Sequence, residues 1–147
     1  MKRKPLLGIF TAVLGALVIL IPYVLLPVCS AALELVSGKA VPMKCFWTAR
    51  AELALGILII AAGILLIAAR NYSFKLAVFI LVAMMGVFVI LFPTLLIGVC
   101  DAATHMCRMG TLPGLSVAGA LIIAVGTAGA FLQWRAIKEA DRSIENE

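Results

Sequence analysis

The stretch LAVFILVAMMGVFVILFPTLLIGV, residues 76–99, decides the fold because it carries no charged side chain over its whole length. An α-helix needs about 20 predominantly apolar residues to cross the hydrocarbon core of a bilayer. Three further uncharged stretches have the same character: Leu6–Val28, Leu53–Ala69 and Leu112–Trp134. Open strands in lipid would leave backbone groups without hydrogen bonds, so the four stretches predict four transmembrane helices.

The composition of the whole chain agrees with this assignment. Of its 147 residues, 65% are hydrophobic and 13% are charged, and the mean hydropathy is +1.20. Such values exclude a water-soluble domain, which needs polar surface on all sides. The sequence therefore predicts an all-α, polytopic membrane protein in which residues 1–147 form a single four-helix transmembrane domain.

The sequence contains an internal repeat. Residues 14–29 (LGALVILIPYVLLPVC) align with residues 85–100 (MGVFVILFPTLLIGVC), which matches Gly15 with Gly86, Pro22 with Pro93, and Cys29 with Cys100. A second segment continues the alignment and matches Thr48 with Thr111, Gly56 with Gly119, and Gly63 with Gly126. Hydrophobicity alone does not explain these matches. We expect two tandem helical hairpins, at residues 4–70 and 75–134, related by a pseudo-two-fold axis along the membrane normal.

The repeated residues have predicted structural roles. Pro22 and Pro93 remove a backbone donor inside a spanning helix, so each is expected to kink its helix, and both are candidates for a helix interface. The repeated glycines are two helical turns apart, which lets neighbouring helices approach closely. Thr48 and Thr111 are predicted to cap the N-termini of the second and fourth helices.

Charged residues flank the second and fourth stretches. The second stretch is short, so its helix is expected to begin about one turn earlier, with Arg50 and Glu52 at the membrane interface, where long side chains reach water. There the two side chains are predicted to form an interfacial ion pair. After Trp134 the chain mixes both charges, and residues 135–147 are expected to prolong the fourth helix as a cytoplasmic tail.

The distribution of basic residues predicts the orientation. Lys2, Arg3 and Lys4 directly precede the first helix, and most other basic residues fall on the same side in a four-span chain. The positive-inside rule then places both termini in the cytoplasm and the protein in the cell (cytoplasmic) membrane. The formal charge of +5 is explained by topology. Nucleic-acid binding is not expected, because no basic stripe is interleaved with aromatic residues.

The four cysteines all lie on the outer side under this topology, at helix ends or in loops. That side is oxidising in most cells, and four cysteines allow three pairings. We favour structural disulfides between Cys29 and Cys45 and between Cys100 and Cys107, because each would close one hairpin across a short loop.

Two other roles for the cysteines are open. A four-helix, quinone-linked disulfide oxidase also carries a cysteine pair in each of two outer loops, but neither pair here has the Cys-x-x-Cys spacing that makes a disulfide reactive. Alternatively, His105, Met106 and Met109 could join Cys100 and Cys107 in a site for copper(I) or zinc, which soft sulfur and imidazole ligands suit. That spacing matches no established zinc motif.

Other catalytic patterns are missing from the sequence, which has no phosphate-binding glycine loop and no paired carboxylates inside a span. We therefore expect no catalytic activity and no cofactor. The predicted function is that of an accessory or assembly subunit that packs against other membrane helices. Its expected partners are the lipid bilayer and other membrane subunits, or further copies of the same chain.

The motif Met43-Lys44-Cys45 is followed by Thr48-Ala49-Arg50-Ala51-Glu52, and a second cysteine-bearing loop precedes Thr111-Leu112-Pro113. This layout resembles a family of short bacterial four-helix membrane proteins known as domain of unknown function 4418. The resemblance covers nearly the whole chain. It implies at most a partner role beside transporter components, and it carries no activity that can be transferred.

Overall fold

The computed structural model describes residues 6–26, 32–34, 40–42, 44–99 and 107–145. Within these ranges the chain forms four long helices: α1 (Leu6–Leu20), α2 (Lys44–Ala68), α3 (Tyr72–Leu91) and α4 (Leu112–Glu145). Three π-helical turns adjoin them: η1 (Ile21–Leu25), η2 (Phe92–Leu96) and η3 (Cys107–Thr111). The four helices, taken with these turns, are long and apolar enough to cross a membrane, which identifies a multi-pass membrane protein.

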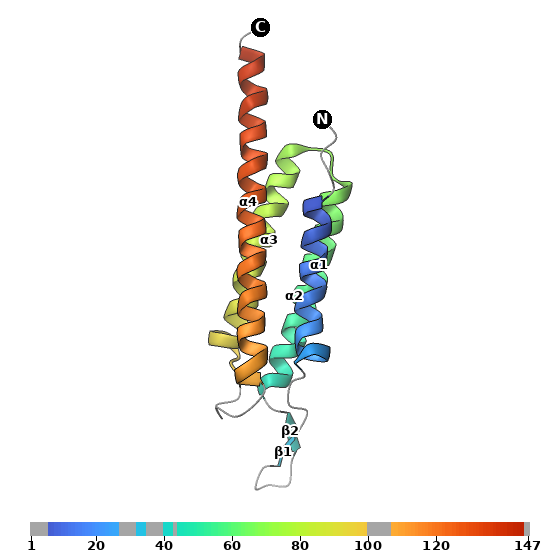
Figure 1. The fold of residues 1–147 in the computed structure, drawn as a ribbon, viewed down its shortest axis with the longest axis vertical. Coiled ribbons are helices and arrows are strands. Elements are labelled where there is room, and N and C mark those ends of the chain that lie inside the picture. The colour runs from blue at the N-terminus through green and yellow to red at the C-terminus, as the bar shows by residue number, and fades with distance from the viewer. Residues whose placement is uncertain (1–5, 27–31, 35–39, 43, 100–106, 146–147) are drawn as a thin grey trace.

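The helices form an elongated bundle of two antiparallel hairpins (Figure 1). α1 packs mainly against α2, and α3 packs mainly against α4, with smaller contacts of α2 with α3 and of α1 with α4. The turn at residues 69–71 joins the hairpins at the end where α1 begins, which we call the turn end. The three π-helical turns lie at the opposite end, which we call the loop end.

Close contacts between glycines hold each hairpin together. A Cβ atom placed on Gly15 of α1 would lie 2.9 Å from the carbonyl oxygen of Gly56 in α2. In the second hairpin, a Cβ atom on Gly86 would lie 3.0 Å from the carbonyl oxygen of Gly119. A larger side chain at these positions would push the helices apart. The glycines therefore permit the close helix packing that the sequence predicted.

The core lies between the four helices, and each helix contributes at least one fully buried hydrophobic residue. Val18, Ile59, Val82 and Ile122 are all 0% exposed. The opposite faces of the helices carry many exposed leucine, isoleucine, valine and phenylalanine side chains. A soluble protein would bury such residues, whereas a membrane-spanning bundle presents them to the lipid tails.

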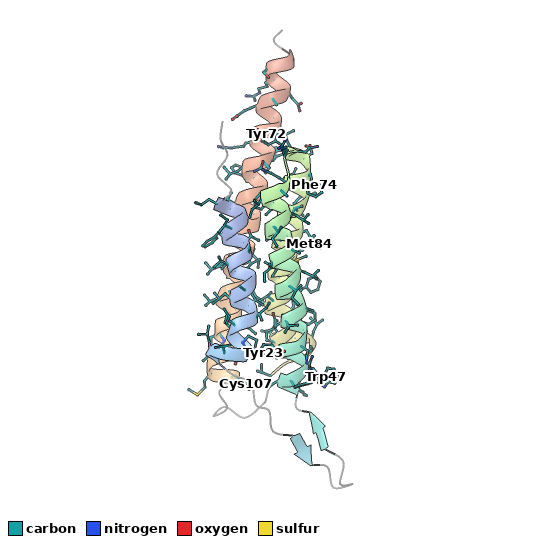
Figure 2. The ribbon with its side chains drawn as sticks, turned by 90° about the vertical axis from the view of Figure 1, so that its right-hand side faces the viewer. Tyr23, Trp47, Tyr72, Phe74, Met84 and Cys107 are labelled. Carbon is teal, nitrogen blue, oxygen red and sulfur yellow. The ribbon has the colours of Figure 1, made fainter. Side chains whose placement is uncertain are left out.

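Exposed aromatic side chains mark both ends of the bundle. Figure 2 shows Tyr23 and Trp47 near the loop end and Tyr72 near the turn end, and all three are about half exposed. Tyrosine and tryptophan collect at the two interfaces between a membrane and water, where their rings lie at the level of the lipid headgroups. The positions of these rings agree with a bundle that crosses the bilayer along its long axis.

Pro22 and Pro93 interrupt the α-helical geometry, as the sequence predicted. Each proline is the second residue of a π-helical turn, η1 after α1 and η2 after α3. Because proline has no N–H group, the regular hydrogen-bond ladder fails at this point. Figure 1 shows the chain turning aside from the helix axis in both segments. Both prolines are buried, so the interface they form is internal to the bundle.

The predicted N-caps at Thr48 and Thr111 are wrong. α2 begins at Lys44, before the start predicted just after Thr48, because the side chains of Lys44 and Arg50 stay exposed although they lie on the helix. Thr48 therefore lies inside α2. Thr111 ends η3, and its hydroxyl group donates a hydrogen bond to the first hairpin instead of accepting one from α4.

Two further features concern segments outside the predicted spans. α4 continues to Glu145, which confirms the predicted prolongation of the fourth helix beyond Trp134. A short antiparallel pair of strands, β1 (Ala32–Glu34) and β2 (Ala40–Pro42), extends beyond the bundle at the loop end (Figure 1). The sequence analysis did not predict these strands, because three residues are too few to show an alternating pattern.

Candidate functional site at the buried polar junction

The buried polar side chains of the loop end come from the start of α2 and from η3. Cys45, Thr48 and Glu52 are three or four residues apart, which places them on one face of α2. Cys107 and Thr111 lie one turn apart in η3, and Figure 2 shows Cys107 at the loop end. None of the five side chains is more than 3% exposed. We call these five residues the polar junction.

Thr48 ties the first hairpin to the second. Its Oγ1 donates a hydrogen bond to the carbonyl oxygen of Gly98, at a distance of 2.9 Å. Gly98 follows η2 and has a φ angle of +79°, in the left-handed region that side chains with a Cβ atom rarely adopt. The local chain path that offers this carbonyl group therefore depends on glycine at position 98.

Thr111 makes the reverse connection. Its Oγ1 donates a hydrogen bond of 3.0 Å to the carbonyl oxygen of Leu26, directly after η1. The second helix of each hairpin is thus bonded to the end of the first helix of the other hairpin. A backbone carbonyl group after a π-helical turn has no helical partner of its own, so each threonine satisfies an acceptor that lipid could not.

Glu52, unlike the two threonines, has no hydrogen-bond partner for its side chain among the described residues. Its side chain is 0% exposed, and neither Oε1 nor Oε2 has a hydrogen-bond partner among the described residues. A buried polar atom without a partner costs about 1–3 kcal/mol, and a charged group costs more. An ionisable residue that is kept inside a membrane span at this cost marks a candidate functional position.

The predicted ion pair between Arg50 and Glu52 is wrong, as is the expectation that the Glu52 side chain reaches water. Residues two positions apart on a helix do not face each other. Glu52 points into the bundle, whereas Arg50 is exposed and its guanidinium carbon lies 5.2 Å from the centre of the Phe46 ring. Arg50 therefore makes a cation–π contact with Phe46 on the outer surface of α2.

The sequence does hold a signal for the burial of Glu52. It lies four residues after Thr48 and four before Gly56, so it shares their helix face. Gln133 is a second buried polar residue that the sequence analysis missed. It is 5% exposed, its Oε1 has no hydrogen-bond partner within the described ranges, and its polarity inside the uncharged stretch of α4 was the available signal.

The structure describes only one cysteine of each predicted disulfide. Cys45 and Cys107 are both buried, Cys45 in the first turn of α2 and Cys107 at the start of η3, so both lie at the loop end of the bundle. Cys29 and Cys100 lie outside the described residues, so the pairs Cys29–Cys45 and Cys100–Cys107 stay a prediction. A reactive thiol needs access to its substrate, and burial of Cys45 and Cys107 argues against that role for these two.

The predicted metal ligands are divided between described and undescribed parts of the chain. His105 and Met106 lie outside the described residues, whereas Met109 is in η3 and is 72% exposed. Within the described ranges, no three histidine, cysteine, aspartate or glutamate side chains come together to hold a metal ion. The copper or zinc site stays a prediction.

The hydrogen bonds of the polar junction hold the two hairpins together. Its two threonine hydroxyl groups donate to carbonyl oxygens, so neither is directed at a base that would activate it as a nucleophile. The junction joins four segments of the chain at one level of the bundle. Among the described residues, Glu52 carries the one carboxyl group of the polar junction. Neither oxygen of this carboxyl group takes part in the hydrogen bonds between the hairpins.

Comparison of the sequence with models of known protein families gives a match. Residues 11–132, which reach into all four helices and include both prolines and the whole polar junction, match the family model described as Domain of unknown function (DUF4418). No curated protein and no solved structure matches the chain.

Proposed function

As the chain belongs to the DUF4418 family, we propose that it is an accessory or assembly subunit of a transporter-type membrane complex. It acts by binding other membrane subunits and has no catalytic activity of its own. The observation that carries this proposal is the length of α4, together with the charges on its final turns.

α4 is longer than a membrane span requires. Its 34 residues correspond to about 50 Å at 1.5 Å per residue, against a hydrocarbon core of about 30 Å. Figure 1 shows its C-terminal part rising beyond the other three helices at the turn end. Because this part is a direct continuation of a spanning helix, it holds its side chains at a fixed height and direction above the membrane.

The charges on this extension suit recognition of a polar partner surface. Arg135, Lys138 and Glu139 are exposed, and so is Arg142. The guanidinium carbon of Arg135 lies 4.6 Å from the Phe131 ring centre, and the Lys138 Nζ lies 5.1 Å from the Trp134 ring centre. These contacts restrict two long cationic side chains, which lowers the entropy that a partner must offset on binding.

Photo-crosslinking tests this proposal. A photoreactive phenylalanine analogue at position 138 is expected to link the chain, in intact cells, to one specific membrane protein. The same analogue at Met84, an exposed residue in the middle of α3, serves as the control and is expected to give no such product. Crosslinking of position 138 only to lipid or to abundant bystander proteins would contradict a subunit role, whereas a product of twice the chain mass would identify the partner as a second copy.

We infer further that the two hairpins are related by the pseudo-two-fold axis that the sequence repeat predicts. The matched close contacts support this relation: Gly15 with Gly56 in the first hairpin corresponds to Gly86 with Gly119 in the second. The π-helical turns at equivalent prolines and the reciprocal threonine bonds add to it. A superposition of the hairpins should require a rotation of roughly 180° about the bundle axis.

The disulfides and the orientation belong to the same proposal. Oxidised Cys29–Cys45 and Cys100–Cys107 pairs would close the loop end, which then faces the oxidising side of the cell membrane, with both termini in the cytoplasm. Labelling of single cysteines tests the orientation: Lys39→Cys and Met109→Cys should react from outside, and Ser73→Cys should not. The reverse pattern would remove the basis for both disulfides.

The alternative function, a membrane thiol-disulfide oxidoreductase, requires cysteines that cycle between the thiol and the disulfide. Burial of Cys45 and Cys107 favours the structural role, because a partner dithiol must reach the sulfur atom in line to exchange with it. Replacement of one cysteine by alanine in an oxidoreductase traps a mixed disulfide with its partner. A trapped product of this kind would replace the subunit proposal by the redox one.

A further inference from the structure

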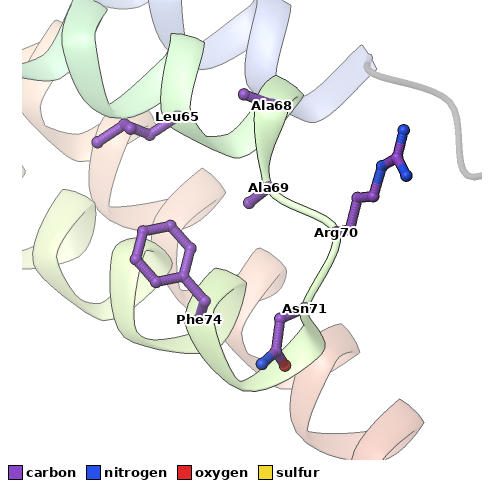
Figure 3. A pocket seen from close by; sticks show the side chains of 6 residues that line it. All are labelled: Leu65, Ala68, Ala69, Arg70, Asn71 and Phe74. Carbon is purple, nitrogen blue, oxygen red and sulfur yellow. The ribbon is translucent and has the colours of Figure 1, made fainter.

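A cavity of about 420 Å³ opens at the turn between the two hairpins, at the opposite end of the bundle from the polar junction. Its walls come from the last turn of α2, the connecting turn and the first turn of α3 (Figure 3), and they consist of Leu65, Ala68, Ala69, Arg70, Asn71 and Phe74. The cavity lies between the end of one candidate span at Ala68 and the start of the next at Tyr72, so we expect it at the depth of the lipid headgroups.

The cavity has an apolar side and a cationic side. Figure 3 shows Leu65 and Phe74 together on the side of the helices, whereas the Arg70 side chain extends from the turn in the other direction. Leu65 and Phe74 are 49% and 47% exposed, so the apolar side is open to the surroundings. A phospholipid has the same polarity along the membrane normal, with an anionic phosphate outside and acyl chains inside.

The turn and the first turns of α3 carry positive charge and no carboxylate. Arg70 is exposed, Lys75 lies in the first turns of α3, and no aspartate or glutamate occurs anywhere in residues 53–99. The N-terminus of α3 adds the positive end of its helix dipole and backbone N–H groups that have no helical acceptor. One of these N–H groups, that of Ser73, is already bonded to Asn71 Oδ1 at 3.0 Å, and this bond fixes the start of the helix.

We propose that this cavity binds an anionic phospholipid. The phosphate lies against Arg70 and the first turn of α3, and one acyl chain follows the exposed surface of Leu65 and Phe74. A cationic pocket between two spanning helices at headgroup depth is the arrangement by which membrane proteins recognise anionic lipids. Inorganic phosphate would match the charge but would leave the apolar wall uncovered, so the geometry favours the lipid.

Native mass spectrometry of the purified protein with defined lipids tests the proposal. The unmodified chain should retain phosphatidylglycerol in preference to phosphatidylcholine, and Arg70→Gln should reduce that retention about tenfold, the loss expected for one partly exposed charge-assisted contact. Arg50→Gln, which removes an exposed arginine at the loop end, is the matched control and should leave the retention unchanged. Equal loss in both variants would show that only overall charge matters and would overturn the site.

A second variant tests the cavity independently of the charge. Ala68→Trp fills the space beside Arg70 but keeps the guanidinium group, and it should also abolish the preference for phosphatidylglycerol. Retention of the preference in Ala68→Trp would overturn the cavity as the binding site. Protection against thermal unfolding by inorganic phosphate, equal to that by phosphatidylglycerol, would overturn the assignment to a lipid. Arg70→Lys keeps the charge and should keep most of the preference, which separates loss of binding from loss of folding.

Discussion

Replacement of Glu52 by leucine is expected to stabilise the bundle. The carboxyl group is fully buried and both its oxygens have no hydrogen-bond partner among the described residues, so its removal gives up no bond that these residues make. The corresponding residue of the second hairpin is Leu115, which is also 0% exposed, so this layer of the bundle already accommodates a leucine. The unsatisfied group costs about 1–3 kcal/mol, and Glu52→Leu should raise the free energy of unfolding by that amount.

Thermal unfolding in detergent micelles, followed by the fluorescence of Trp47 and Trp134, measures the change. For a chain of this size, about 1–3 kcal/mol corresponds to a rise of the melting temperature of about 3–10 °C. Glu139→Leu, at an exposed position of α4, is the control and should change the stability by less than about 0.5 kcal/mol. A fall of the melting temperature in Glu52→Leu would refute the reasoning, because it would mean that the carboxyl group makes bonds that stabilise the fold.

The same variant addresses the role of Glu52. Natural chains keep destabilising groups where function requires them, so a stabilised Glu52→Leu protein is expected to be impaired in forming its membrane complex. Co-purification of the complex from cells that produce each variant at equal levels measures this loss. A stabilised variant that assembles normally would show that the carboxyl group has no part in assembly.

Three further predictions concern the packing and the cysteines. Gly119→Val should destabilise the bundle by about 1–3 kcal/mol in chemical unfolding, because its side chain would collide with Ile90 and with the Gly86 carbonyl oxygen; an unchanged stability would contradict the close packing. Gly98→Ala should cost about 1–2 kcal/mol for a different reason, since no atom lies within 4 Å of the added Cβ and only the left-handed backbone is strained; Gly98→Asn, which tolerates that conformation, should cost less. Mass spectrometry after alkylation without reductant should find all four cysteines oxidised, and removal of one pair should lower the stability by about 2–4 kcal/mol; alkylated thiols in the native protein would contradict the disulfides.

The spanning helices could be predicted from the sequence because lipid imposes a simple demand, an uncharged stretch of sufficient length. The start of α2 shows the limit of that rule. Lys44 and Arg50 interrupt the apolar pattern, yet α2 begins at Lys44 and continues through Arg50, because both side chains remain on its exposed face. A hydropathy pattern averages over all faces of a helix, so it placed the boundary too late, and the prediction of a cap at Thr48 failed with it.

The polar junction could be predicted only in part. The matched positions of Thr48 and Thr111 singled them out as important, but their acceptors lie 50 and 85 residues away along the chain. Such pairs depend on how the hairpins dock and have no local sequence signal. Glu52 was misplaced for a related reason: its nearest charged neighbour in sequence, Arg50, suggested a pair, although helix geometry directs the two side chains to different faces.

The two threonine bonds also set an order of events during synthesis. The chain is made from its N-terminus, so α1 and α2 enter the membrane before Gly98 or Thr111 exists. Throughout that interval, the Leu26 carbonyl group lacks its donor from the second hairpin, and the Thr48 hydroxyl group keeps only the 3.4 Å contact with the Lys44 carbonyl oxygen of its own helix. The two bonds between the hairpins therefore form in sequence, because the Thr48 acceptor is made with Gly98 and the Leu26 donor is made later with Thr111. A chain that stalls before Thr111 therefore lacks the donor that joins the end of the first helix to the second hairpin, even if Gly98 is already present.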